Sequence, residues 1–190
     1  MLYTVKTSRI GIEAKELQES SLRHSNRYEG ILSAVGAGFF LLLIGMLFVT
    51  IPGLSDSIVS YVTHFRTVQV GGTSVYLPAP IDVHPIDATL VYSAVWRFSI
   101  IWAVFLVALL IARFVVHSPA RRKAEELGNV VFWFGTVYLV QTYLVGAVNF
   151  RDPTNWFLFW ATVVILIGVS FVVRGIFLTL FSIASPRKSQ

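Results

Sequence analysis

The segment 81–87 holds the residues best suited to bind a metal ion. Asp82, His84 and Asp87 supply one imidazole and two carboxylates there, and ligand sets of this kind bind iron or zinc in proteins. However, Pro85 restricts how the three side chains can converge, and Asp87 is placed to cap a following helix. We therefore favour a helix cap at Asp87 and keep a metal site as the alternative.

Three polar side chains interrupt the long apolar runs of the chain: Arg97, Gln141 and Arg174. Ionisable residues inside such runs are costly in hydrocarbon, which makes them functional candidates. An arginine near the end of a run can also extend its side chain to the headgroup region, and we favour this for Arg97 and Arg174. Gln141 suits a hydrogen bond between helices. The alternative is that the three line a path for a small anion or a lipid headgroup.

Catalytic groupings do not stand out in the sequence. All ten acidic residues lie outside the uncharged parts of the apolar runs, which argues against a proton- or cation-coupled transporter. No Ser-His-Asp set and no pair of histidines suited to haem is visible. The chain has no cysteine, which excludes disulfides, thiolate metal sites and cysteine nucleophiles. We expect a protein that is not an enzyme and holds no cofactor.

The composition indicates an integral membrane protein. Of the 190 residues, 55% are hydrophobic and 13% are charged, and the mean hydropathy is +0.71, whereas soluble domains carry about 25% charge. The net charge of +5 fits the basic cytoplasmic loops of a membrane protein better than a nucleic-acid partner. The expected partner is therefore the lipid bilayer.

Four runs are long enough to cross a bilayer, which takes about 20 apolar residues in a helix. They cover about 31–51, 88–116, 128–148 and 156–184. The sequence thus predicts an all-α integral membrane protein, with an antiparallel bundle of four transmembrane helices in a single domain, 29–184. Residues 1–28 form a cytoplasmic segment that is predicted to be helical, and residues 185–190 form a tail.

The distribution of basic residues sets the expected orientation. Eleven Lys and Arg residues lie on one side of the four runs and two, Arg66 and Arg151, lie on the other. Because basic residues favour the cytoplasmic side, we expect both termini in the cytoplasm and the protein in the plasma membrane.

The loop 52–87 is long enough to form a small cap outside the membrane. A short interfacial helix is predicted through Phe65, with Ile58, Val62 and Phe65 on one face and three polar residues, Ser57, Ser60 and His64, facing away. After it, segments 67–70 and 73–77 are predicted to form a β-hairpin, because the glycine pair 71–72 permits a tight turn.

Small residues recur at helical spacing in two of the predicted spans. The glycines among them are Gly38 and Gly45 in the first span and Gly128, Gly135 and Gly146 in the third. Such stripes let membrane helices approach closely. We expect them to pack helices within the bundle, with self-association as the alternative.

Two segments, Asn129-Val-Val-Phe-Trp-Phe-Gly135 and Gly168-Val-Ser-Phe-Val-Val-Arg-Gly175, resemble a group of small uncharacterised archaeal four-span membrane proteins. The resemblance covers the last three spans, implies an archaeal plasma membrane and brings no catalytic residues with it. We expect a non-catalytic accessory or structural protein that contacts a membrane-protein partner or a second copy through its helices or its cap. The alternative is a small anion or lipid-headgroup transporter or channel.

Overall fold

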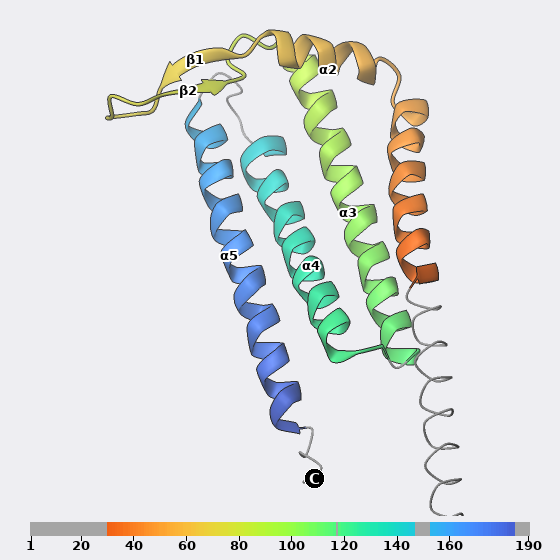
Figure 1. Cartoon of the computed structure of the whole chain (residues 1–190). Helices are drawn as coiled ribbons and strands as arrows, with labels where there is room; N and C mark the ends of the chain where they lie inside the picture. The colour runs from red at the N-terminus through yellow and green to blue at the C-terminus, as the bar shows by residue number, and fades with distance from the viewer. Residues whose placement is uncertain (1–29, 117, 147–152, 185–190) are drawn as a thin grey trace, which may run out of the picture.

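A computed structural model describes residues 30–116, 118–146 and 153–184. Long helical segments lie side by side in it (Figure 1). In chain order they are Gly30–Thr50, α3 (Pro85–Val115), α4 (Ala120–Leu139) with the π-helix η1 (Val140–Val145), and α5 (Pro153–Ala184). The predictions for residues 1–28 and 185–190 lie outside the described residues.

Three of these helices are long and apolar enough to cross a membrane. They are Gly30–Thr50, Pro85–Val115 and Pro153–Phe181, which correspond to the first, second and fourth predicted spans. The mostly helical fold and the small hairpin are as predicted.

The third predicted span differs from the expectation. Its helix begins at Ala120 rather than at residue 128, so that its first two turns carry five charged residues, and it changes to a π-helix at Val140. The π-helix ends at Val145, and the N–H of the next residue, Gly146, donates to the carbonyl O of Gln141 at 2.8 Å. The charged first turns explain why α4 by itself is less apolar than its neighbours.

The loop between the first helix and α3 forms the cap, which consists of α2 (Leu54–Thr63), β1 (Arg66–Gln69) and β2 (Tyr76–Ala79). The strands are antiparallel, with Arg66 opposite Ala79 and Gln69 opposite Tyr76. Gly72 has a φ of 73° and lies in the connecting turn, as the glycine pair predicts, although the strands begin and end one to three residues away from the predicted segments. Figure 1 shows α2 lying across the end of α3 and the hairpin extending past α5.

The predicted faces of α2 were partly wrong. Ser57, which was placed on the polar face, is 3% exposed, whereas Val62 of the apolar face is 62% exposed. The buried side of α2 consists of Leu54, Ser57 and Tyr61. The physical reason is a hydrogen bond: Ser57 turns inward because its hydroxyl donates to Asp87 of α3.

The core is concentrated at the cap end, where α2, α3, η1 and α5 meet. Tyr61, Tyr92, Val140 and Phe159 belong to its main buried cluster. A smaller cluster of Ile51, Leu54 and Ala94 joins the first helix, α2 and α3.

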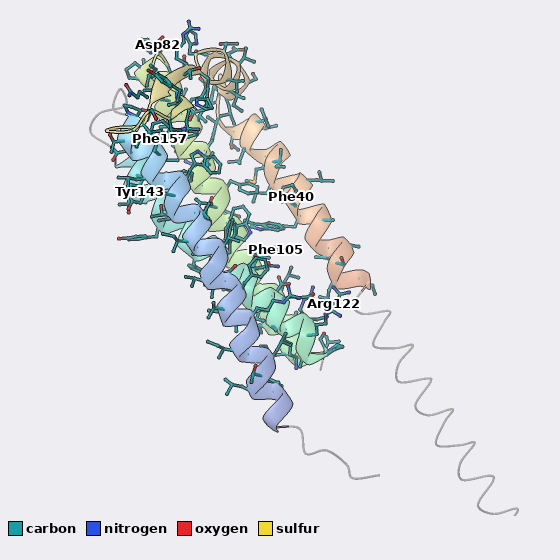
Figure 2. The ribbon with its side chains drawn as sticks, turned by 60° about the vertical axis from the view of Figure 1, so that its left-hand side comes forward. Phe40, Asp82, Phe105, Arg122, Tyr143 and Phe157 are labelled. Carbon is teal, nitrogen blue, oxygen red and sulfur yellow. The ribbon has the colours of Figure 1, made fainter. Side chains whose placement is uncertain are left out.

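Aromatic side chains join the first helix to α3 further along. Phe39 stacks on Phe105 with ring centroids 3.9 Å apart, and Phe40 packs edge-on against Trp102. Figure 2 labels Phe40 and Phe105 in this region between the two helices.

The glycine stripes behave differently in the two helices. On α4, a Cβ at Gly135 would overlap the methyl groups of Leu166, and a Cβ at Gly128 would lie 3.3 Å from the carbonyl O of Ser170, so both glycines lie against α5. At Gly38, in contrast, a Cβ would have nothing within 4 Å among the described residues, and the same holds for Gly45.

Gly38 and Gly45 therefore do not pack closely against another helix among the described residues. Gly36 faces α3 instead, since its Cβ would lie 3.7 Å from Leu109 Cδ1. Gly146 has a local role, because a Cβ there would lie 2.8 Å from the carbonyl O of Gln141, which closes the π-helix.

Substitution of Gly135 by leucine should destabilise the protein, because the new side chain would force α4 and α5 apart. Overpacking of this kind costs about 1–3 kcal/mol. Thermal unfolding in detergent should show a lower Tm for Gly135→Leu, whereas Gly38→Leu should unfold like the wild type. Equal effects of the two substitutions would contradict the placement of the glycine contacts.

Candidate functional site

The three residues of the predicted metal site have separate roles in the structure. Asp87 accepts hydrogen bonds from Ser57 Oγ at 3.0 Å and from Ser60 Oγ at 2.8 Å. Asp82 forms an exposed ion pair with Arg66 at 3.3 Å. Within the described part of the chain, no group of three or more His, Asp or Glu side chains is arranged to hold a metal ion.

The N-cap residue of helix α3 is His84, whereas Asp87 was predicted to cap this helix. The Nδ1 of His84 accepts a hydrogen bond from the backbone N–H of Ile86 at 3.4 Å, and Pro85 is the first helical residue, a position where its missing N–H costs nothing. Asp87 lies in the first turn instead, where a carboxylate interacts favourably with the helix dipole and joins α2 to α3.

Two tyrosines add a second contact between α2 and α3. Tyr61 Oη donates to Tyr92 Oη at 3.2 Å, and the two rings pack edge-on. Burial raises the pKa of Tyr61, and its neighbour Tyr92 raises it further. On α5, Trp156 packs edge-on against Tyr61, and its Nε1 donates to the carbonyl O of Pro78 at 3.2 Å. The cap is thus fixed to both α3 and α5.

A polar cavity of about 610 Å³ lies beside these contacts, lined by Ser60, His64, Ile81, Asp82, Val83, His84 and Pro85. Two of its polar groups make local bonds. His64 Nδ1 lies 2.6 Å from the carbonyl O of Ser60, and Asp82 binds Arg66. The first contact is local to the end of α2, and the second joins the start of β1 to the segment before α3.

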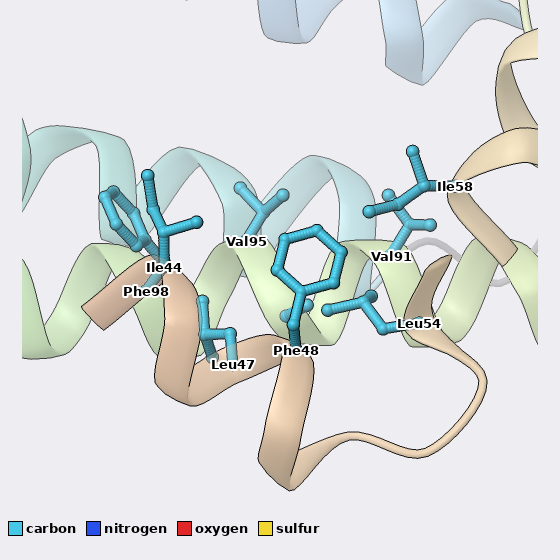
Figure 3. A pocket seen from close by; sticks show the side chains of 9 residues that line it. Ile44, Leu47, Phe48, Leu54, Ile58, Val91, Val95 and Phe98 are labelled. Atoms are coloured by element: carbon cyan, nitrogen blue, oxygen red, sulfur yellow. The ribbon is translucent and has the colours of Figure 1, made fainter. Parts of the chain in front are cut away.

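An apolar cavity of about 270 Å³ lies where the first helix, α2 and α3 meet. Figure 3 shows Phe48 of the first helix, Leu54 and Ile58 of α2, and Val91 and Val95 of α3 around it. All nine lining residues are apolar, so this cavity has no group to orient a polar ligand.

The opposite end of the molecule carries the main charge interactions. Arg174 Nη2 of α5 donates to Glu125 Oε1 of α4 at 2.8 Å. Arg121 and Arg122 also approach the Glu125 carboxylate, at 3.3 Å and 3.4 Å. Arg174 is therefore paired with a carboxylate, which differs from the expectation that it would extend to the headgroups with no protein partner.

The next residue of α4 pairs with the helix on the other side. Glu126 Oε2 lies 3.5 Å from Arg113 Nη2 of α3, and the two side chains are 7% and 10% exposed. Burying two charges is costly, and removing one partner of such a pair is strongly destabilising. We call Glu125, Glu126, Arg113 and Arg174 the glutamate clamp, because two adjacent residues of α4 bind both neighbouring helices.

Sequence reasoning missed this clamp because it assigned the two glutamates to a connecting loop. The signal that could have identified it is the spacing: the acidic pair comes immediately before an apolar run, and each neighbouring run carries an arginine near its charged end. Helix α4 begins early enough for the pair to face both neighbours.

Arg97 and Gln141 do not join Arg174. Arg97 is exposed on α3 and Gln141 is exposed in η1, and neither they nor Arg174 line the cavities described here. Along α3, Arg97 is 16 residues from Arg113, or about 24 Å at the rise of a helix. Arg97 therefore lies far from the end of the helices that holds Arg174.

A crevice of about 490 Å³ lies between the first helix, α3 and α4. Its apolar wall includes Phe40, Trp102 and Leu106, and Arg113, Glu126 and Asn129 are among its polar lining residues. Unlike the apolar cavity, it combines a hydrophobic wall with charged and hydrogen-bonding groups.

Comparisons with family models, with curated proteins and with solved structures give no match.

The two ion pairs of the clamp should differ in energetic weight. Arg113→Gln leaves Glu126 buried without its cation, and removal of a buried partner costs about 3–5 kcal/mol. Arg174 is 33% exposed, and solvent screening limits such a pair to about 0.2–1 kcal/mol. Thermal unfolding in detergent should therefore give a much lower Tm for Arg113→Gln than for Arg174→Gln.

A double-mutant cycle isolates the Arg174 contact. The combined Arg174→Gln and Glu125→Gln variant should lose less stability than the two single variants added together. Strict additivity, or no effect of Arg174→Gln on the Tm, would show that the pair does not couple α4 to α5.

Proposed function

We propose that this protein is a non-catalytic integral membrane protein that crosses the bilayer four times and acts as an accessory or structural component through its cap. Three apolar helices support membrane insertion. The proposed fourth span is α4 with η1, which lies between α3 and α5 (Figure 1).

Helix lengths support the fourth span. About 20 residues cross roughly 30 Å of hydrocarbon. Counting 20 residues from Glu125 along α4 reaches Val145, where η1 ends, and counting back from Arg174 reaches Thr154, the second residue of α5. A slab that begins at Glu125 and Arg174 thus ends where η1 ends and where α5 begins.

The charges support an orientation. Arg113, Arg121, Arg122 and Lys123 all lie near the clamp, and basic residues favour the cytoplasmic side. We place the clamp at the cytoplasmic face of the cell membrane, both termini in the cytoplasm and the cap outside.

The observation that supports the accessory role is that the acidic side chains bind other helices of the same chain. Asp87, Glu125 and Glu126 each bind a residue of another helix of the same chain. A transporter for anions or lipid headgroups would instead need polar residues along a shared cavity, and Arg97, Gln141 and Arg174 line neither the polar cavity, the apolar cavity nor the crevice. The polar side chains thus serve to hold the helices and the cap together.

The hairpin is the part of the cap best placed to meet a partner. Val75, Tyr76 and Leu77 are 52%, 61% and 43% exposed, and β1 pairs with β2 in a sheet of two strands. Exposed strand edges and apolar side chains are common features of protein contact surfaces. We propose that this hairpin contacts another membrane protein or a second copy of the chain.

A photo-crosslinking residue at Tyr76 tests this function in native membranes, with the same residue at Leu41 as a control, since Leu41 is 69% exposed on the first helix. We expect a discrete protein adduct from position 76 and lipid adducts alone from position 41. Vesicles containing the purified protein should show no anion flux. An anion flux that Arg174→Gln abolishes, or lipid adducts alone at position 76, would overturn the proposal.

A further inference from the structure

The crevice between the first helix, α3 and α4 has the form of a site for an amphiphile. Its volume of about 490 Å³ falls within the range of about 300–1,000 Å³ that is usual for small-molecule sites. The apolar wall can accommodate a hydrocarbon chain, and the charged residues can contact a headgroup.

Small residues on the first helix make room for the crevice. Gly36 and Ala37 line it opposite Leu106 and Leu109 of α3. The Cβ of a residue at position 36 would already be in ordinary contact with Leu109, at 3.7 Å, so a larger side chain at position 36 or 37 would enter the crevice. Gly38 does not line it, and a Cβ there would meet nothing within 4 Å among the described residues.

The charges that line the crevice are of opposite sign and lie side by side. Arg113 and Glu126 are 3.5 Å apart, and Asn129, which is exposed, follows one turn later on α4. A purely anionic headgroup would bring its charge next to Glu126, and a purely cationic one would bring its charge next to Arg113. A headgroup with a phosphate and an ammonium group complements both.

We propose that this crevice binds a phospholipid with a zwitterionic phosphoethanolamine headgroup. The phosphate lies at Arg113, the ammonium group lies at Glu126, and one hydrocarbon chain follows the wall at Phe40 and Trp102. The inference rests on the proposed membrane location, in which these charges lie at the cytoplasmic face. It adds a specific lipid of the inner leaflet to the proposed role of the cap.

Native mass spectrometry of the full chain in mild detergent tests this site with three defined lipids, which carry phosphoethanolamine, phosphoglycerol or diglycosyl headgroups. We expect one phosphoethanolamine lipid to be retained in preference to the other two. Ala37→Leu should weaken its retention about tenfold, because the leucine occupies the space of the chain. Gly38→Leu is the matched control and should retain the lipid like the wild type.

A second variant tests the headgroup without breaking the buried ion pair. Asn129→Leu removes a hydrogen-bonding group at the surface, and it should reduce the preference for phosphoethanolamine over phosphoglycerol at an unchanged Tm. Equal or stronger retention of phosphoglycerol lipid, retention that Ala37→Leu leaves unchanged, or a second copy of the chain in place of the lipid would overturn the proposal. The adduct at position 76 is measured independently, so failure of either experiment is distinguishable from failure of the other.

Discussion

The contact on which the arrangement of the long helices depends most is the pair of adjacent glutamates on α4. Because consecutive helical residues point about 100° apart, Glu125 and Glu126 reach opposite neighbours, Arg174 on α5 and Arg113 on α3. A rotation or a one-residue shift of α4 would break both ion pairs at once. The clamp therefore fixes the register of α4 between its neighbours at one end, and the close contact of Gly135 with Leu166 continues that register along the helix.

At the other end, the contacts that join the cap to α3 and α5 use neutral groups and the Asp87 carboxylate. Asp87 binds two serines of α2, and Trp156 binds the backbone of β2 at Pro78. These contacts join residues that are up to 78 positions apart in sequence. The helices are thus joined by charge at one end and by a hydrogen-bonded cap at the other, with apolar and aromatic contacts between. This division suits a protein whose middle lies in hydrocarbon, where unpaired charge is costly.

Much of this arrangement could be predicted from the sequence, because it depends on local patterns. Runs of about 20 apolar residues mark long helices, and the glycine pair at 71–72 marks the turn of the hairpin. What could not be predicted depends on partners distant in sequence. The period of α2 assigned Ser57 to the solvent side, since no local pattern shows that Asp87 lies opposite it. In the same way, hydropathy placed Glu125 and Glu126 in a loop, although α4 begins before them.

The glycines of the first helix are a second example, because spacing in the sequence does not show which glycine contacts another helix. Spacing alone put Gly38, and not Gly36, in the small-residue stripe of the first helix. The structure distinguishes them, because only the position of Gly36 faces α3. The alternative in which Arg97, Gln141 and Arg174 share one path stays a hypothesis, and spacing gave no indication of the crevice beside Arg113.

The central claim is that α4 crosses the membrane, with the clamp in the cytoplasm and the cap outside, and cysteine accessibility tests it most directly. The chain has no cysteine of its own, so single cysteines report without background. In intact cells, a membrane-impermeant maleimide should label Gly71→Cys in the hairpin and Thr154→Cys at the start of α5. It should label Arg121→Cys, at the start of α4, only after the membrane is permeabilised. Labelling of positions 121 and 154 from the same side would contradict the account.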